Sequence, residues 1–381
     1  MNDEQKLNVL VLWSDTRAAN YGLRVLSHGN ERLIKDAFSC EVAVDFQDFG
    51  PGDSDTSFGT KSIIRDIFRR CGPITAKIRK YDLIVDTGAG DSFADIYGLK
   101  RLIFIAYAHQ IIKKNKVPLV LAPQTIGPFN TKIGRFFARR SLQIARLVSV
   151  RDSASAEYVK TLGRSADVTA TDVVFALPFE NFDTKNVYDI LFNVSGLLWF
   201  SDDHGNSLRY RSETIATITS LIKSGRRVDL LPHVIASKSG NDDVDASKEL
   251  AELLIDSGVN GVETIIASDL TEMRSFMSAA KLVIGARMHA CLNALSVGTA
   301  AIPWAYSRKF SPLLGDLGWR YVVDLSTSAS PTADTLSMID SLTVKPETEL
   351  IDSIRSKAAR SFEDYSSRLS AIVNWKIDVS N

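Results

Sequence analysis

The chain has 381 residues, the length of two or three ordinary domains. Hydrophobic residues make up 45% and charged residues 24%, a balance that excludes a fibrous or mainly disordered protein. Lysine plus arginine and aspartate plus glutamate both number 45, so the formal net charge is zero. A dedicated nucleic-acid-binding protein normally carries a basic excess, and we expect no nucleic-acid partner. The three cysteines, Cys40, Cys71 and Cys291, lie far apart and fit neither a disulfide framework nor a zinc site. Free thiols indicate a reducing compartment.

The amino terminus does not resemble a targeting segment. Its first apolar run, Leu7–Trp13, stops before Ser14 and lacks the positive start and the small-residue cleavage site of a signal peptide. No window of the sequence approaches the roughly 18 uninterrupted apolar residues of a membrane-spanning helix. We therefore expect a soluble protein of the cytoplasm.

Short apolar runs alternate with longer helical patterns in the first half of the chain. The predicted strands are Leu7–Trp13, Cys40–Asp45, Tyr81–Thr87, Pro118–Leu121, Leu147–Val150 and Val168–Thr171. The predicted helices are Tyr21–Phe38, Lys100–Lys114, Thr131–Ala145 and Asp152–Leu162. Continuous apolar strands are typical of a parallel sheet that is buried on both faces, and their alternation with helices indicates βαβ crossovers.

The second half of the chain repeats this alternation. The predicted strands are Tyr188–Ser195, Val228–Pro232, Gly261–Ile265, Leu282–Gly285, Ala300–Ala305 and Tyr321–Asp324. The predicted helices are Glu213–Ser224, Asp243–Ser257, Thr271–Ala279 and Met288–Val297. The pattern predicts a second parallel α/β domain.

A polar segment with one proline, Leu177–Lys185, separates the two halves. We expect an α/β protein with two Rossmann-like, doubly wound domains, over residues 1–180 and 181–344. A helical tail follows over residues 345–381, for which packing back on the first domain is one option. Two such domains facing each other place a ligand cleft at the carboxyl ends of both sheets.

Two segments carry local positive charge. Residues 61–80 hold seven basic residues against one acid, Asp66, and residues 132–151 hold six basic residues and no acid. These segments are either solvated helix faces or a face for anionic lipid or an anionic saccharide carrier. The second alternative predicts peripheral contact with the inner face of a membrane.

The highest density of chemically useful side chains follows the predicted strand Leu282–Gly285. This strand leads to Arg287 and His289 at the start of the next helix. A helix amino terminus favours anions, because its N–H groups are unpaired and its dipole is positive there. An arginine adds a bidentate fork that suits phosphate or carboxylate.

The next predicted strand leads to a second basic loop, which contains Ser307, Arg308 and Lys309. Two basic loops at neighbouring strand ends predict a site for a small polyanion. The alternative for His289 is a core histidine that donates to a backbone carbonyl.

Short motifs lie at the ends of several predicted strands. They are GARMHACLNALS at 285–296, AYSRKF at 305–310, DLIVDTGAGDSF at 82–93, APQTIGPF at 122–129, SVRDSAS at 149–155 and LPHV at 231–234. With these motifs the chain resembles the polysaccharide pyruvyl transferase family from about Asn20 to Gly318. One difference is that Leu23 follows Asn20-Tyr-Gly22, where the family often has an acidic residue. The resemblance implies a two-domain, GT-B-like fold and transfer of a pyruvyl group from phosphoenolpyruvate to a sugar as a ketal.

The chemistry implied by this resemblance assigns roles to the basic loops. Phosphoenolpyruvate is a co-substrate, and no further cofactor is expected. Arg287 and Lys309 would bind its carboxylate and phosphate and stabilise the departing phosphate. His289 would deliver or relay the proton as general acid. Ser307 and His233 would complete the donor side, with a structural role as the alternative for His233.

The first domain is expected to bind the acceptor saccharide, which is lipid-linked, nucleotide-linked or polymeric. The candidate residues are Asn20, Asp91, Gln124 and Arg151. Gly88-Ala-Gly90 allows a close backbone approach but lacks the third glycine of a dinucleotide fingerprint. Asp91 would act as a base toward a sugar hydroxyl or hydrogen-bond it, or else cap the next helix. Arg151 either faces the cleft or pairs with a carboxylate, with Asp152 as a helix cap.

No metal site is expected. Asp53-Ser-Asp55 and Asp243-Val-Asp245 match the short DxD pattern of some glycosyltransferases, but such pairs occur by chance in acidic loops. Two other functions stay open: a glycosyltransferase of the GT-B type that uses a nucleotide sugar, and a non-catalytic sugar-binding relative. The sequence does not predict the oligomeric state.

Overall fold

The computed structural model describes residues 6–52, 54, 56–69, 71–178, 187–237, 240–344 and 347–378, with side chains described up to residue 373 at the carboxyl end. Two expected domain boundaries lie outside the described residues: the one at 180–181, within residues 179–186, and the start of the tail at residue 345. The same holds for Asp53, Asp55 and Arg70. Internal contacts divide the chain into two compact units. Unit 1 comprises Met1–Ala18, Leu23–Leu177 and Lys357–Asn381, and unit 2 comprises Ala19–Gly22 and Pro178–Ser356.

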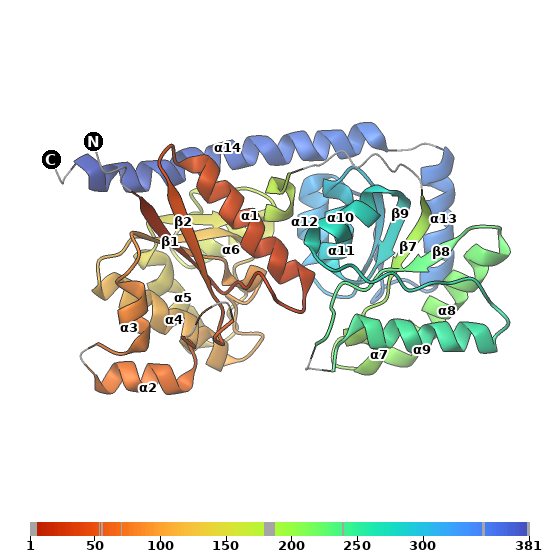
Figure 1. Ribbon diagram of the computed structural model, residues 1–381, viewed down its shortest axis with the longest axis horizontal. Coiled ribbons are helices and arrows are strands. Elements are labelled where there is room, and N and C mark those ends of the chain that lie inside the picture. Colours follow the sequence, from red (N-terminus) through yellow and green to blue (C-terminus); the bar gives the residue numbers. More distant parts are fainter. Residues whose placement is uncertain are drawn as a thin grey trace. The chain divides into compact units, whose positions relative to one another are not determined.

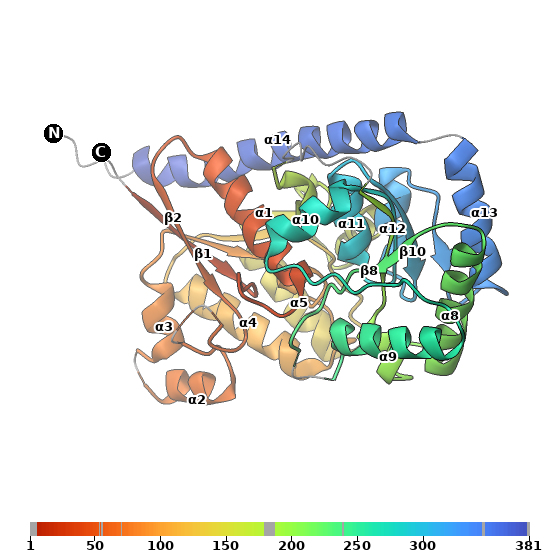
Figure 2. The same ribbon diagram turned by 45° about the vertical axis from the view of Figure 1, so that its right-hand side comes forward.

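Unit 1 is built on a six-stranded parallel sheet with the strand order β2-β1-β3-β4-β5-β6. The strands are β1 (Leu7–Leu12), β2 (Val42–Gln47), β3 (Leu83–Asp86), β4 (Leu119–Gln124), β5 (Leu147–Val150) and β6 (Val168–Thr169). The helices are α1 (Tyr21–Ala37), α2 (Thr60–Phe68), α3 (Pro73–Ile78), α4 (Leu99–Lys114), α5 (Lys132–Ile144) and α6 (Ser153–Thr161). Two 3-10 turns are η1 (Gly88–Gly90) and η2 (Val173–Ala176). Figures 1 and 2 show α3 and α4 on one side of β1 and β2 and α1 on the other.

Unit 2 is built on a five-stranded parallel sheet with the strand order β11-β10-β9-β7-β8. The strands are β7 (Tyr188–Asn193), β8 (Val228–Leu230), β9 (Ala280–Gly285), β10 (Ala300–Ala305) and β11 (Val323–Asp324). The helices are α7 (Gly196–Phe200), α8 (Ser207–Lys223), α9 (Asp243–Asp256), α10 (Leu270–Ser278), α11 (Met288–Ser296), α12 (Phe310–Leu317) and α13 (Pro331–Val344). Helix α14 (Thr348–Asp378) begins in unit 2 and is grouped with unit 1 from Lys357 onward. The predicted fold class, two parallel doubly wound α/β domains, is confirmed.

Some predicted elements differ from the structure. The expected strand Gly261–Ile265 is only an isolated bridge between Thr264 and Leu230. Helix α8 begins at Ser207 rather than at Glu213, because Asn206 accepts a hydrogen bond from the N–H of Arg209 and caps it. Several further helices were not predicted: α2, α3, α7, α12 and α13.

A buried polar cluster fixes the end of β3 in unit 1. Asp86 accepts hydrogen bonds from Trp13 Nε1 and from the N–H of Gly88, and its Oδ2 lies 2.8 Å from His109 Nε2. Asp86 and His109 are both buried. A buried carboxylate is costly unless its oxygens are hydrogen-bonded, so these partners stabilise both the carboxylate and the Gly88–Gly90 turn that follows it.

We expect replacement of His109 by leucine to lower the free energy of unfolding by about 1.5–3 kcal/mol, because Asp86 loses a buried hydrogen-bond partner. Denaturant unfolding measures this change. His28→Ala is the matched control, since His28 is exposed on α1. It should change the unfolding free energy by less than about 0.5 kcal/mol. Equal effects of the two substitutions would contradict a stabilising role for the His109–Asp86 contact.

Candidate functional site

The carboxyl edge of the unit 2 sheet is organised by one buried side chain, Asp243, the first residue of α9. Its carboxylate accepts hydrogen bonds from the backbone N–H groups of Gly196, His233 and Val234, at 2.8–3.1 Å. These three residues belong to the segments that follow β7 and β8. Asn193, at the end of β7, donates to the same carboxylate at 3.2 Å. Asp243 therefore ties several strand ends together.

Arg287 pairs with this carboxylate from the loop after β9. Its Nη2 lies 2.7 Å from Asp243 Oδ1, its Nε lies 3.2 Å from the same oxygen, and Nη2 also donates to the carbonyl of Asn241. The backbone N–H of Arg287 donates to Asn193 Oδ1. Burial by itself would lower the pKa of Arg287, but the charge and the hydrogen bond of Asp243, together with smaller contributions from Tyr306 and Tyr210, raise the pKa above its ordinary value. The guanidinium is thus fixed and charged, and among the described residues Nη1 makes no hydrogen bond.

The segment Ala19–Gly22 lies against the two candidate histidines. Asn20 forms an antiparallel bridge with Val234, and the N–H of Tyr21 donates to the carbonyl of His233 at 3.1 Å. A Cβ atom at Gly22 would lie 2.7 Å from His289 Nδ1. Only a glycine at this position therefore lets the His289 ring sit where it does. Asn20, expected on the acceptor side of the first domain, is grouped with unit 2 because of this pairing.

Asn293, one turn after His289 on α11, links the histidines to a buried arginine. Its Nδ2 donates to the carbonyl of His289 at 2.8 Å and lies 3.4 Å from His233 Nε2. Its Oδ1 accepts a hydrogen bond from Arg274 at 3.1 Å. Asn293 and Arg274 were not predicted as site residues, although Asn293 lies at i+4 from His289, a spacing that places both on one helix face.

Cys291 also lies within this motif but is not a reactive thiol. The side chain is buried, and burial raises the pKa of Cys291 far above its ordinary value. Its Sγ donates to the carbonyl of Gly285. The thiol therefore has a packing role.

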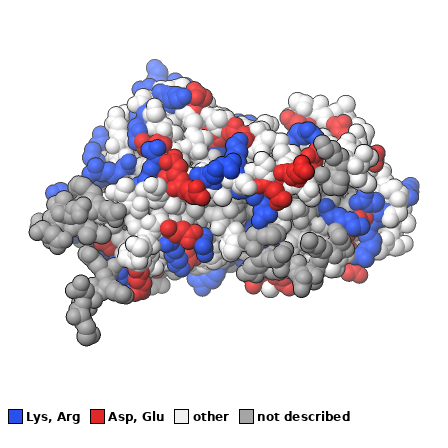
Figure 3. Space-filling view, turned by 90° about the horizontal axis from the view of Figure 1, so that it is seen from above, with Lys and Arg blue, Asp and Glu red and all other residues white. Residues whose placement is uncertain are grey.

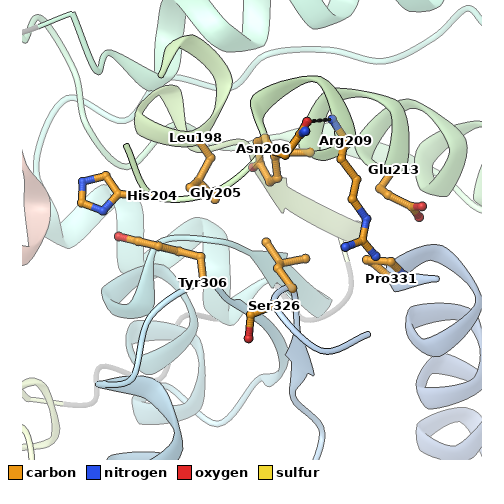
Figure 4. Close-up of a pocket in the computed structure, with 11 residues that line it drawn as sticks. Leu198, His204, Gly205, Asn206, Arg209, Glu213, Tyr306, Ser326 and Pro331 are labelled. Carbon is orange, nitrogen blue, oxygen red and sulfur yellow. Dashed lines mark hydrogen bonds between the residues drawn. The ribbon is translucent and has the colours of Figure 1, made fainter. Parts of the chain in front are cut away.

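A small pocket lies beside the loop after β10. It has a volume of about 100 Å³, and Figure 4 shows His204 and Asn206 on one side and Tyr306 and Ser326 on the other. The rings of His204 and Tyr306 meet edge to face at 5.9 Å. Tyr306 and Tyr210 both line the pocket, and both contribute to the raised pKa of Arg287.

Two serine hydroxyls at this edge are buried without a hydrogen-bond partner among the described residues. They are the Oγ atoms of Ser195, after β7, and Ser307, after β10. Ser307 lies next to Tyr306 and two residues before Lys309, which is half-buried. Buried hydroxyls normally have partners, so these atoms are suited to hydrogen-bond a ligand.

The acceptor-side candidates of unit 1 have mostly structural contacts. Arg151 is buried and forms an ion pair with Asp172 at 2.8 Å, and Asp152 caps α6. The structure thus has the second of the two arrangements expected for Arg151, a paired arginine next to a helix cap. Gln124 is buried under Gly88 and donates to the carbonyl of Asp86. Asp91 does not cap α4, which begins after Gly98; it accepts a hydrogen bond from the Tyr97 hydroxyl.

Asp243 and Asp245 do not form a DxD metal site. The carboxylate oxygens of Asp243 already accept hydrogen bonds from several donors, and Asp245 is exposed on α9. Within the described ranges, no group of three or more His, Cys, Asp or Glu side chains is placed to hold a metal ion. Across the described helices, none combines the length and the apolar composition needed to cross a membrane.

Solved structures with this fold cover nearly the whole chain. A UDP-GlcNAc 2-epimerase from Neisseria meningitidis, bound to UDP-GlcNAc, is 12% identical and gives a TM-score of 0.60, over 95% of this chain and 99% of that chain. Alr3699/HepE from Anabaena, in complex with UDP-glucose, is 15% identical and gives 0.51, over 98% and 99%. At these identities the likeness shows the fold alone, which is GT-B-like.

The sequence comparisons are more specific. No curated protein matches the chain significantly. The family model of the polysaccharide pyruvyl transferases matches residues 20–308, which is most of the chain and includes Arg287, His289, Ser307 and Arg308. The chain therefore belongs to the polysaccharide pyruvyl transferase family.

Proposed function

We propose that the protein transfers the pyruvyl group of phosphoenolpyruvate to two hydroxyls of a sugar in a polysaccharide or glycoconjugate precursor, with release of phosphate. The observation that carries this proposal is the cationic edge of unit 2, where Arg287, His289 and the Ser307–Lys309 loop follow neighbouring strands in a chain of this family. The three cysteines are free, which supports a cytoplasmic location.

The proposed reaction consumes one phosphoenolpyruvate and two sugar hydroxyls and yields one ketal and one phosphate. One sugar hydroxyl adds to the central carbon of phosphoenolpyruvate while the methylene carbon takes up a proton. The phosphate then leaves, and a second hydroxyl attacks the same carbon to close the ketal. Of the two hydroxyl protons, one is in effect retained in the new methyl group and the other leaves with phosphate. The chain must therefore bind a trianion, supply a proton and stabilise a leaving phosphate.

The contacts of Arg287 indicate how donor binding and proton transfer would be shared among the residues of this edge. Because Asp243 neutralises its charge, Arg287 offers a fixed hydrogen-bond donor, Nη1, rather than a net positive charge. The charge that attracts the donor would come from Lys309 and Arg308 and from the amino terminus of α11. His289 is the proposed proton donor. Ser307 Oγ would hydrogen-bond the donor, and His233 would support His289 through Asn293.

In unit 1 we propose Asp91 as the residue that hydrogen-bonds an acceptor hydroxyl. Asp91 follows the Gly88–Gly90 turn at the carboxyl edge of the sheet. Gln124 and Arg151 are proposed as positioning residues, since the N–H of Arg151 donates to the carbonyl of Gln124 and Gln124 packs against Gly88. The identity of the acceptor sugar is left to the assay.

We expect phosphoenolpyruvate to raise the melting temperature of the protein and to release inorganic phosphate when a suitable saccharide is present. Turnover should persist in excess EDTA, because the proposed chemistry uses cationic side chains and no Lewis acid. Stabilisation by UDP-sugars but not by phosphoenolpyruvate would favour the alternative of a nucleotide-sugar glycosyltransferase. Activity that EDTA removes and magnesium restores would contradict metal independence.

Two substitutions test the position and role of His289. His289→Gln should lower turnover by about 10²–10⁴-fold with a smaller change in donor affinity, because a general acid acts in the transition state. Gly22→Ala should displace the His289 ring and lower turnover by about 10²-fold. Calorimetry and single-turnover rates separate binding from chemistry.

The matched control is Gly315→Ala in α12, where an added Cβ meets no atom within 4 Å. It should leave turnover unchanged. If His289→Gln bound phosphoenolpyruvate poorly but reacted normally once saturated, His289 would be a binding residue and not the proton donor.

Arg287→Ala should lower the free energy of unfolding by about 3–5 kcal/mol, because it leaves Asp243 as an unpaired buried charge. Arg287→Lys should recover little donor affinity, since an ammonium cannot bond Asp243 as Nε and Nη2 do and also present a donor in the place of Nη1. Lys309→Ala should weaken donor binding about tenfold to hundredfold, the loss of one charge-assisted bond, without a comparable loss of stability. Unchanged donor binding by Lys309→Ala would remove Lys309 from the donor site.

A further inference from the structure

Helix α2 exposes three large apolar side chains on one stripe. Ile64, Ile67 and Phe68 are 48%, 63% and 84% exposed, and their spacing of three and four residues places them side by side on the helix. Lys61 and Arg65 form the adjacent stripe and are also exposed. The outward surface of α2 is therefore apolar along one side and basic along the other.

This helix is fixed to its neighbour by its buried side. Asp66 accepts hydrogen bonds from the N–H groups of Ile74 and Thr75 and from the Thr75 hydroxyl, at 2.8–3.1 Å. It thereby caps the amino terminus of α3. Ser62, one turn earlier, is buried as well. The apolar stripe thus belongs to a helix that is held in place by specific contacts.

The neighbouring helices of unit 1 have a similar composition. Helix α2 contacts α3 and α4, and α4 contacts α5 (Figure 1). Helix α5 exposes Ile133 and Phe136, which are 55% and 59% exposed. The basic residues of α2–α5 are Lys61, Arg65, Lys77, Lys100, Arg101, Lys113, Lys114, Lys132, Arg135, Arg139 and Arg140. The single acid in these four helices is the buried Asp66.

The face seen in Figure 3 and helix α1 differ from this composition. Figure 3 shows one face on which basic and acidic side chains are interspersed. On α1, Lys35 pairs with Glu31 and Arg32 with Asp36, so both of these cations have an acidic neighbour. The exposed cations of α2–α5 lack such acidic residues on their own helices. Within α2–α5 the exposed basic residues therefore outnumber the exposed acidic ones, although the whole chain has zero formal net charge.

We propose that α2, supported by α5, docks the protein on the surface of an anionic lipid bilayer. Ile64, Ile67 and Phe68 enter the headgroup region, and Lys61 and Arg65 contact lipid phosphates. Charge complementarity selects this occupant, because a bilayer with anionic lipids accepts apolar side chains and attracts basic ones at the same surface. The docking requires no turnover, so it is independent of the proposed transferase activity.

Cosedimentation of the full chain with phosphatidylcholine vesicles, with and without phosphatidylglycerol, tests the proposal. The protein should bind the anionic vesicles, and binding should weaken with salt, which screens exposed charges over about 8–10 Å near physiological ionic strength. Phe68→Ser should lower the partition coefficient roughly tenfold to hundredfold. Lys61→Gln and Arg65→Gln should each lower it about fivefold.

Matched controls lie on other elements. Leu208 on α8 is a 74% exposed apolar residue, and Arg360 on α14 is an exposed cation, so Leu208→Ser and Arg360→Gln should leave binding unchanged. The variant Phe68→Trp should show a blue-shifted emission on anionic vesicles, which reports insertion. No binding to anionic vesicles at low salt, or equal binding by Phe68→Ser and Leu208→Ser, would overturn the proposal. Binding to an acidic soluble protein but not to vesicles would also overturn it.

Discussion

The arrangement of the unit 2 site depends on one constraint, the need to satisfy a fully buried carboxylate. Asp243 has no access to water, so its charge is tolerable only with a full set of donors. These donors come from the ends of β7, β8 and β9: the side chain of Asn193, backbone N–H groups after β7 and β8, and the guanidinium of Arg287. The hydrogen bonds to the Asp243 carboxylate therefore hold in place the loops after β7, β8 and β9, and any ligand site at this edge consists of these loops.

This constraint separates two kinds of basic residue at the same edge. Arg287 is held rigidly, but its charge is largely cancelled by Asp243. Lys309 and Arg308 lie on the following loop, and Arg308 is exposed. A rigid, neutralised hydrogen-bond donor suits the proposed role of Arg287, which is to orient the substrate rather than to attract it. His289 belongs to a third category, because its ring is placed by the close approach of Gly22 rather than by an ion pair.

The positions of most strands could be predicted from the sequence, but the hydrogen-bond network around Asp243 could not. Most predicted strands and the helices α1, α4, α5, α6, α9, α10 and α11 lie where apolar periodicity placed them, because burial sets that periodicity. The motif around Arg287 and His289 was also visible, because its residues are adjacent in sequence. Asp243 instead takes its partners from positions 193 to 287, and its pairing depends on tertiary structure. Helix α2 was not predicted, because three of its four large apolar residues, Ile64, Ile67 and Phe68, are exposed, and only Ile63 packs against the core.

The composition of the whole chain does not reveal that the helices α2–α5 of unit 1 are rich in basic residues. Equal numbers of acidic and basic residues argue against a general affinity for polyanions. Exposed charges, however, interact over only about 8–10 Å at physiological ionic strength, so a partner responds to the charge within that distance and not to the total. On α1 each of the paired cations has an acid within the same turn, whereas on α5 no residue is acidic. A chain with zero net charge can therefore present a strongly basic surface when its acids are placed on other elements or, like Asp66, are buried as helix caps.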